Sequence, residues 1–288
     1  MRLTLLAAAA TLVATVPLPA LAQEAGGTRT VRDALGALDA HAALGEVLAH
    51  ERRAEDRARD QYRHPGETLE FFQLRPGMTV VDYVPAGGWY TRILVPYLGP
   101  EGRYIAMGPD VRLENQRNQE YWGGQDAKVR AQVAEDGLTG AAVSGFSSDA
   151  VPEQLAGTVD RVLIFREVHN QLRNGWLHRD LIAIRNILKP DGMLGIVQHR
   201  ADEDAPFAMR DGSKGYLRER DLIALMDLYG FELVGKSEVN ATARDPKDWP
   251  NGVWMLPPNF RGATDETRPR LIEIGESDRM TLLFRKRD

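Results

Sequence analysis

Between residues 78 and 198 the sequence alternates short β-branched runs with amphipathic segments, and this alternation restricts the fold more than any other feature. We expect strands in five runs, at 78–84, 104–107, 141–146, 161–165 and 193–198. We expect the main helices between them at 90–98, 115–135 and 177–188. Strands separated by helices are typical of βαβ units, in which helices cover a mostly parallel sheet.

The C-terminal part departs from this alternation. A predicted helix at 217–229 leads into a strand at 231–234, and the last strand is expected at 280–285. Connections of about 40 residues are usually functional or disordered in a compact domain. Because this one contains Trp249 and Trp254, we expect an ordered loop packed on the domain.

The first 22 residues have the pattern of a secretory signal peptide. Arg2 precedes an apolar run at 3–17, and Ala20-Leu21-Ala22 provides a small-x-small cleavage site. A membrane-spanning helix is the alternative, and the prolines that interrupt the run argue against it. We therefore expect a periplasmic protein. It has no cysteine, so neither a disulfide nor a thiol nucleophile is available.

The rest of the chain divides into a helical extension at 23–64 and one domain at 65–288. Eight of the ten residues at 51–60 are charged, with both signs interleaved, which is typical of a solvated helix face. The alternative is a lid that brings Arg57, Arg59 or Arg63 over an active site. The net charge of −5 gives no electrostatic signature of nucleic acid or an anionic membrane, which favours a small-molecule partner.

Six short stretches carry a resemblance to known proteins. They are RHPGETLEFF at 63–72, PGMTVVD at 76–82, GGWYT at 87–91, FREVHN at 165–170, QHRA at 198–201 and ESDR at 276–279. Together they resemble exported bacterial predicted methyltransferases with the class I S-adenosylmethionine-dependent methyltransferase fold. The resemblance implies a Rossmann-like α/β sheet of seven strands, with the last inserted antiparallel. It places the ligand at the carboxyl ends of the strands.

The turn after the first strand is where this resemblance places the cofactor, S-adenosylmethionine. In typical relatives the turn reads acid-x-Gly-x-Gly-x-Gly. Asp82 takes the place of the acid, Val84 and Ala86 replace the first two glycines, and Gly88 matches the third. A Cβ narrows the approach of a ligand, and a valine with positive φ would be strained. The alternative is a turn that only connects strand to helix, with no cofactor bound.

The remaining expected cofactor contacts also follow from the resemblance. Ala86 and Gly87 would offer backbone groups. Asp110 lies two residues beyond Gly108, which stands where an acid normally binds the ribose. Asp149 lies in the segment that normally reads the adenine.

Polar side chains at the ends of the fourth and fifth predicted strands are the candidates for chemistry. Arg166, Glu167 and His169 follow one strand, and His199 ends the next. Adjacent parallel strands lie about 4.8 Å apart, so we expect these groups to face one cleft. Imidazole titrates near neutral pH and suits proton transfer. Tyr90 is a candidate proton donor.

Three functions remain open from these residues. The first is methyl transfer from S-adenosylmethionine to a small, aromatic acceptor, with His169 as base and Arg166 holding an anionic group. The second is a cofactor-independent lyase or isomerase that uses His169 and His199. The third is a periplasmic small-ligand binding protein. A metal site formed by Glu167, both histidines and Asp202 lacks a fixed ligand spacing, so we predict no metal.

Overall fold

The computed structural model describes residues 31–287. The predicted signal peptide at 1–22 and the start of the predicted extension, 23–30, lie outside the described residues.

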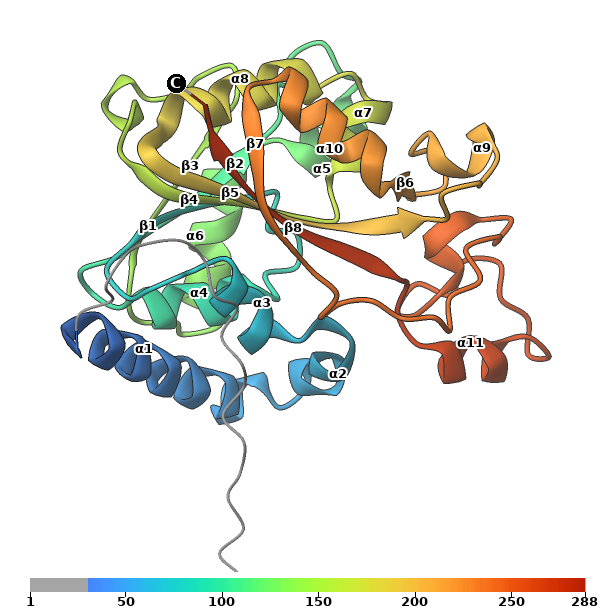
Figure 1. The fold of residues 1–288 in the computed structure, drawn as a ribbon, viewed down its shortest axis with the longest axis horizontal. Helices are drawn as coiled ribbons and strands as arrows, with labels where there is room; N and C mark the ends of the chain where they lie inside the picture. The colour runs from blue at the N-terminus through green and yellow to red at the C-terminus, as the bar shows by residue number, and fades with distance from the viewer. Residues whose placement is uncertain (1–30, 288) are drawn as a thin grey trace, which may run out of the picture.

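The core of the fold is one twisted sheet in the order β3-β2-β1-β4-β5-β8-β7, to which a short β6 is added at the end of β5 (Figure 1). The strands are β1 (Thr79–Tyr83), β2 (Arg103–Gly108), β3 (Ala142–Ser147), β4 (Val159–Phe165), β5 (Leu188–Ala201), β6 (Leu217–Arg218), β7 (Phe231–Ser237) and β8 (Arg279–Lys286). Strands β1 to β5 pair in parallel, and β8 is antiparallel to both β5 and β7. The predicted fold class is therefore confirmed, with β6 as an additional strand.

Helices cover both faces of the sheet, as parallel strands with continuous apolar runs require. On one face, Leu44 of the first helix, α1 (Val31–Ala49), Ile93 of α4 and Val129 of α6 share an apolar cluster with the sheet. On the other face, Leu181 of α8 and Leu222 of α10 join a second cluster. The bounds are α4 (Thr91–Leu98), α5 (Gln116–Trp122), α6 (Gln125–Glu135), α7 (Val168–Arg173), α8 (Leu177–Ile187) and α10 (Glu219–Leu228).

Several boundaries differ from the sequence prediction: the expected helix at 217–229 begins as the strand β6, and the expected helix at 115–135 is divided into α5 and α6. The fifth strand starts at Leu188, directly after α8, because Lys189 to Gly192 continue in extended backbone instead of forming a separate turn. His169 and Asn170 belong to α7 and are not part of the strand end. The polar groups after β4 are therefore fixed in the first turn of a helix.

The N-terminal extension is helical, as predicted, but short 3-10 turns break it. It consists of α1 (Val31–Ala49), η1 (Glu51–Arg53), η2 (Asp56–Arg59) and α2 (Asp60–Arg63), and α3 (Pro65–Phe71) follows. Asp56 accepts two hydrogen bonds from Arg92 of α4, at 2.6 and 2.8 Å. Trp89 donates to the Asp56 carbonyl at 3.3 Å. These contacts fix the extension across the start of α4.

The long connection between β7 and β8 is ordered and packed, as predicted. Leu256 and Leu271 are almost fully buried, and Trp249 and Phe260 pack against them. The connection contains η4 (Gly252–Met255) and an unpredicted helix, α11 (Arg268–Ile274). Two further short segments are η3 (Glu153–Leu155) and α9 (Phe207–Arg210).

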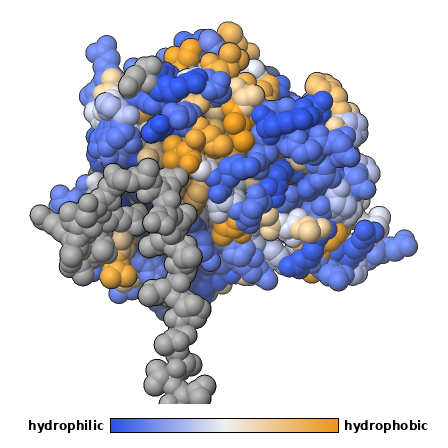
Figure 2. Space-filling model, in the orientation of Figure 1, coloured by the Kyte–Doolittle hydropathy of each residue, from blue (hydrophilic) through white to orange (hydrophobic). Residues whose placement is uncertain are grey.

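The face shown in Figure 2 is mostly hydrophilic, with apolar groups gathered near its top, where Figure 1 places α8 and α10. Ile182 and Leu228 are the large apolar side chains exposed on these two helices. In the part of the chain that the structure describes, no helix is both long and apolar enough to span a membrane.

Candidate active site

A cavity of about 600 Å³ opens at the carboxyl ends of β4 and β5. Its wall comes from four further parts of the chain: the N-terminal extension, α5, the η4 connection and the start of β8. The lining includes Arg166, Glu167, His169 and His199, so the structure brings four of the predicted catalytic residues together. This edge of an open α/β sheet is where ligands generally bind.

The segment that follows β4 is strained and places two charged groups in the cavity wall. Arg166 has a φ of +63°, which is uncommon for a residue with a side chain. Next to it, Glu167 accepts a hydrogen bond from Asn170 at 2.7 Å. Burial raises the pKa of Glu167 to about 7, against the lowering effect of that hydrogen bond. Glu167 is therefore suited to exchange protons near neutral pH.

His169 is buried and neutral. Burial, together with the positive charge of nearby Arg173, lowers its pKa to about 3. The Gln198 Nε2 donates to the carbonyl of Gly215 at 2.7 Å and lies 3.4 Å from the His169 Nδ1. Since that amide nitrogen only donates, Nδ1 accepts and Nε2 carries the proton. Among the described residues the Nε2 of His169 has no hydrogen-bond partner, which leaves one buried donor for a ligand.

His199 lies beside His169, with ring centroids 5.7 Å apart. Its Nδ1 is 2.6 Å from the Oγ of Ser277. Burial holds the pKa of His199 well below its ordinary value, and His169 and Arg279 act in the same direction. Both imidazoles are therefore uncharged at neutral pH.

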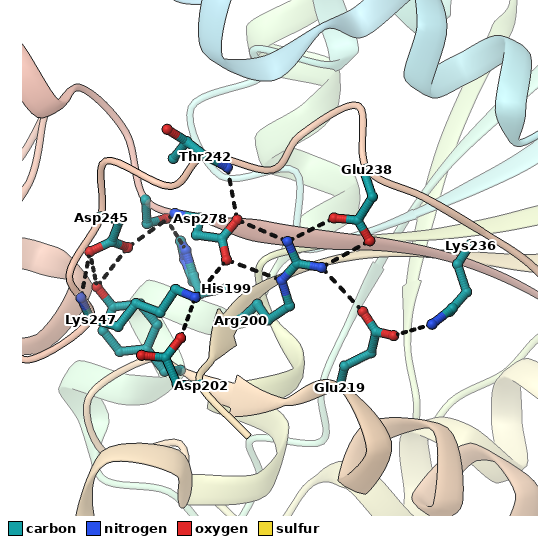
Figure 3. A network of polar contacts seen from close by, with 12 residues as sticks. His199, Arg200, Asp202, Glu219, Lys236, Glu238, Thr242, Asp245, Lys247 and Asp278 are labelled. Carbon is teal, nitrogen blue, oxygen red and sulfur yellow. Dashed lines mark hydrogen bonds and ion pairs between the residues drawn. The ribbon is translucent and has the colours of Figure 1, made fainter. Parts of the chain in front are cut away.

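A network of ion pairs behind His199 fixes the end of β5 (Figure 3). Arg200 donates to both oxygens of Asp278, at 3.0 and 3.1 Å, and also pairs with Glu238 and Glu219. Lys247 bridges Asp278 and Asp202, so Asp202 lies in this network and does not complete a metal site with the histidines. Among residues 31–287, no group of three or more potential metal ligands is found.

The turn after β1 retains the backbone expected of a glycine-rich loop. Val84, Ala86 and Gly88 have φ of +50°, +52° and +68°, so each of the three glycine positions is left-handed. Val84 is nonetheless buried in the core, and Gly88 packs against the Gln132 side chain. None of the predicted loop residues Ala86, Gly87 and Gly88 lines the cavity.

Asp82 is buried below this turn. It accepts a hydrogen bond from the Tyr104 hydroxyl at 2.8 Å, and that hydroxyl also contacts Thr91. Burial raises the pKa of Asp82 to about 7, although the Tyr104 bond and Arg166 oppose this shift.

The end of β2, where a ribose would be expected, is closed by the chain itself. A Cβ at Gly108 would lie 2.8 Å from the Gln125 Cγ and 3.2 Å from the Trp122 carbonyl oxygen. Arg112 bonds to both Asp110 and Asp149 at 2.9 Å. Hydrogen bonds from Arg112 lower the pKa of Asp110 to about 2. In this arrangement Arg112 occupies the two carboxylates that the resemblance assigns to S-adenosylmethionine.

Tyr90 lies beneath the cavity and does not line it. Its ring stacks on Phe165 with centroids 3.5 Å apart, and burial raises the pKa of Tyr90 to about 12. Of the aromatic residues in the long connection, Trp254 reaches the cavity and packs edge-on against His169, with centroids 5.7 Å apart.

Several further residues of the cavity wall are not marked by any local sequence pattern. From the ESDR stretch, Glu276, Ser277 and Arg279 face the cavity. Tyr121 and Trp122 of α5 do so as well, and only their position after the second strand pointed to them. Arg59 and Arg63, which the lid alternative placed over the active site, also line the cavity, whereas Arg57 does not.

Comparisons with known proteins address the fold. No family model matches the chain, and no curated protein matches it in sequence. A chain from the complex of the Haloferax volcanii Trm112 methyltransferase activator with a putative methyltransferase shares 15% identity. It matches with a TM-score of 0.51 over 85% of this chain and 98% of that one. The [4+2]-cyclase SpnF shares 16% identity, with a TM-score of 0.52 over 78% of this chain and 80% of that one. Together with the strand order, these similarities show that the chain has the class I methyltransferase fold.

Proposed function

We propose that the protein is an acid–base enzyme that acts on a small molecule without S-adenosylmethionine, as a lyase or isomerase. The observation that carries the proposal is the buried Nε2–H of His169, which has no hydrogen-bond partner among residues 31–287 and shares a cavity with Glu167, whose pKa burial raises to about 7. Glu167 is matched to proton transfer at neutral pH, and the Nε2–H of His169 is placed to stabilise a developing oxyanion.

In the proposed reaction, ionised Glu167 removes a proton from a carbon next to a carbonyl or carboxylate group. The C–H electron pair forms the carbon–carbon double bond of an enolate, and its oxygen accepts a hydrogen bond from the His169 Nε2. Arg166 provides positive charge at the same edge. In an isomerase the enolate is conjugated to a further double bond, and Glu167 returns the proton to the far carbon as the carbonyl re-forms. In a lyase the enolate electrons re-form the carbonyl and break the bond to a substituent on the β-carbon, and the leaving group accepts the proton from Glu167. His199, held by Ser277, shapes the wall beside His169.

Similarity in fold is compatible with this proposal. One solved structure with the same fold is named a [4+2]-cyclase, so the fold is not restricted to proteins named methyltransferases. Trp254 gives the cavity an aromatic wall, which favours a planar or aromatic substrate. Export to the periplasm through residues 1–22 is part of the proposal.

Methyl transfer is the second candidate function, and the left-handed backbone at Val84, Ala86 and Gly88 favours it. In that case Arg112 would have to leave Asp110 and Asp149 to admit the nucleoside.

Titration of the mature protein with S-adenosylmethionine and S-adenosylhomocysteine, followed by calorimetry and thermal shift, separates the two functions. We expect no saturable binding. Binding that Asp110→Asn weakens would support methyl transfer instead. For the acid–base reaction, small carbonyl and carboxylate compounds are incubated in D2O, and exchange of carbon-bound hydrogen is followed by NMR. Glu167→Gln should abolish exchange while the protein stays folded. If no compound exchanges and Glu167→Gln changes only ligand affinity, the protein is a binding protein.

A further inference from the structure

Four arginines meet at one end of the cavity, and only one of the acidic residues there is hydrogen-bonded to them. Arg59, Arg63 and Arg279 all donate to the carboxylate of Glu276, at 2.6 Å from Arg59 and 3.1 Å from Arg63. Glu276 and Arg279 are almost fully buried, and so is Arg63. Burial alone would raise the pKa of Glu276, but Arg279, Arg63 and Arg59 hold it well below its usual range. Glu276 is therefore ionised, and its carboxylate already accepts hydrogen bonds from these three arginines.

Arg166 is the fourth arginine of this cluster. Within the described part of the chain, its guanidinium forms no hydrogen bond or ion pair with another side chain. Burial lowers the pKa of Arg166, and neighbouring Arg279 lowers it further. Its strained backbone, with φ of +63°, directs this unpaired cation to the cavity. Arg166 is half-buried in the cavity wall, and with no partner among residues 31–287 its guanidinium is available to an anion from outside the chain.

Two other carboxyl groups lie near Arg166, and neither compensates it fully. Asp82 is engaged by Tyr104, and Glu167 by Asn170. Burial raises the pKa of both acids to about 7, so each is only partly ionised at neutral pH.

The rest of the wall adds to the excess of positive charge. Arg117 of α5, Arg173 of α7 and Arg261 of the long connection also line the cavity, which contains seven arginines and two glutamates. Arg173 and Arg261 lie over the Trp254 ring, at 5.6 and 5.3 Å from its centroid. The whole chain has a net charge of −5, so this positive region is local to the site.

We propose that the substrate is a small organic anion whose carboxylate or phosphate group is bound by the guanidinium of Arg166 at the end of β4. Guanidinium groups bind both types of oxyanion through paired hydrogen bonds. Glu276 and its three arginines form the fixed floor beside that group, and Arg117 contacts the anion from the rim. The inference rests on the proposed function only in locating the substrate in the same cavity.

The test measures binding and does not require turnover. The mature protein is titrated by calorimetry with phthalate, phenyl phosphate and inorganic phosphate, with benzamide as a neutral probe of similar shape. We expect at least one organic anion to bind at millimolar concentration or below and benzamide not to bind. The two organic probes distinguish a carboxylate site from a phosphate site.

Arg166→Gln should weaken binding of the anion about ten- to hundred-fold, in line with the loss of a charge-assisted contact. Because Arg166 has a strained backbone, Arg117→Gln at an exposed position serves as a second variant and should weaken binding several-fold. Arg285→Gln is the matched control, since Arg285 is exposed and pairs with Glu232 far from the cavity. Equal binding by all three variants, or no binding of any anion by the folded protein, would overturn the inference. Anion binding that survives in a Glu167→Gln protein without turnover would support it independently of the reaction.

Discussion

At the scale of single residues, the turn after β1 keeps a glycine backbone without two of its glycines. A left-handed residue with a side chain is strained by about 1–2 kcal/mol relative to glycine. Such strain is concentrated at functional sites because the surrounding structure must maintain it. The turn therefore adopts a left-handed backbone at Val84 and Ala86 without the glycines that usually favour it.

Ala86→Gly should relieve part of this strain. Ala86 is exposed, so little packing is lost, and glycine accepts a φ of +52° without a clash. After subtraction of the greater entropy of an unfolded glycine, we expect a gain of about 0.5–1 kcal/mol in the free energy of unfolding. Gly88→Ala is the opposite case, because its φ is +68° and a Cβ would meet Gln132. This substitution should lower the free energy of unfolding, measured by urea titration, by about 1–2 kcal/mol. Equal effects of the two substitutions would contradict this account.

Asp82 gives the stability a defined dependence on pH. Its pKa rises from 3.8 in the unfolded chain to about 7 in the fold, so the folded state holds a proton that the unfolded state has lost between these values. Stability from this group is therefore present below about pH 4 and is lost as the pH rises to about 7.

Asp82→Asn removes this dependence and keeps an acceptor for Tyr104. We expect the free energy of unfolding of the variant to rise, relative to that of the wild type, by on the order of 1 kcal/mol per pH unit between about pH 4 and 7. Urea unfolding at several pH values measures the difference. Parallel curves for the two proteins would show that Asp82 does not titrate in this range.

At the scale of elements, the N-terminal extension depends on a few specific contacts with α4. Both Asp56 and Arg92 are largely buried, and their two hydrogen bonds have good geometry. The same segment carries Arg59 and Arg63 into the cavity wall. The position of two site residues thus depends on an ion pair outside the site.

Asp56→Asn should loosen residues 51–64 locally. We expect the free energy of unfolding to fall by about 1 kcal/mol and amide hydrogens in this segment to exchange faster, with little change in the exchange rates of the sheet. Asp126→Asn is the control, because its i,i+4 pair with Arg130 is about half exposed and should contribute little. If exchange rises throughout the molecule, the extension is an integral part of the folding core.

At the scale of the whole molecule, the sequence predicted the sheet well because its strands are continuous apolar runs between clear breaks. Val80 and Val81 of β1 and Ile164 of β4 are fully buried, as such runs predict. The helix α11 was missed because its segment, Arg268–Ile274, has only two buried positions and follows a long polar loop.

The site was predicted in part for a related reason. Arg166, Glu167, His169 and His199 follow strands, so topology alone brings them to one edge. Glu276 and the arginines of the extension meet only through long-range folding, since 217 residues separate Arg59 from Glu276. No local sequence pattern predicts this contact.

The shared carboxylate of Glu276 also has a consequence for the order of assembly. It joins Arg59 and Arg63, near the beginning of the described chain, to Arg279, the first residue of its last strand. That strand inserts between β5 and β7, so the sheet closes only when nearly the entire polypeptide is available. Contacts this distant in sequence form late because of the loop entropy that they must overcome. We therefore expect the cavity to be among the last features to form, so that a folding intermediate with a complete parallel half-sheet would still lack it.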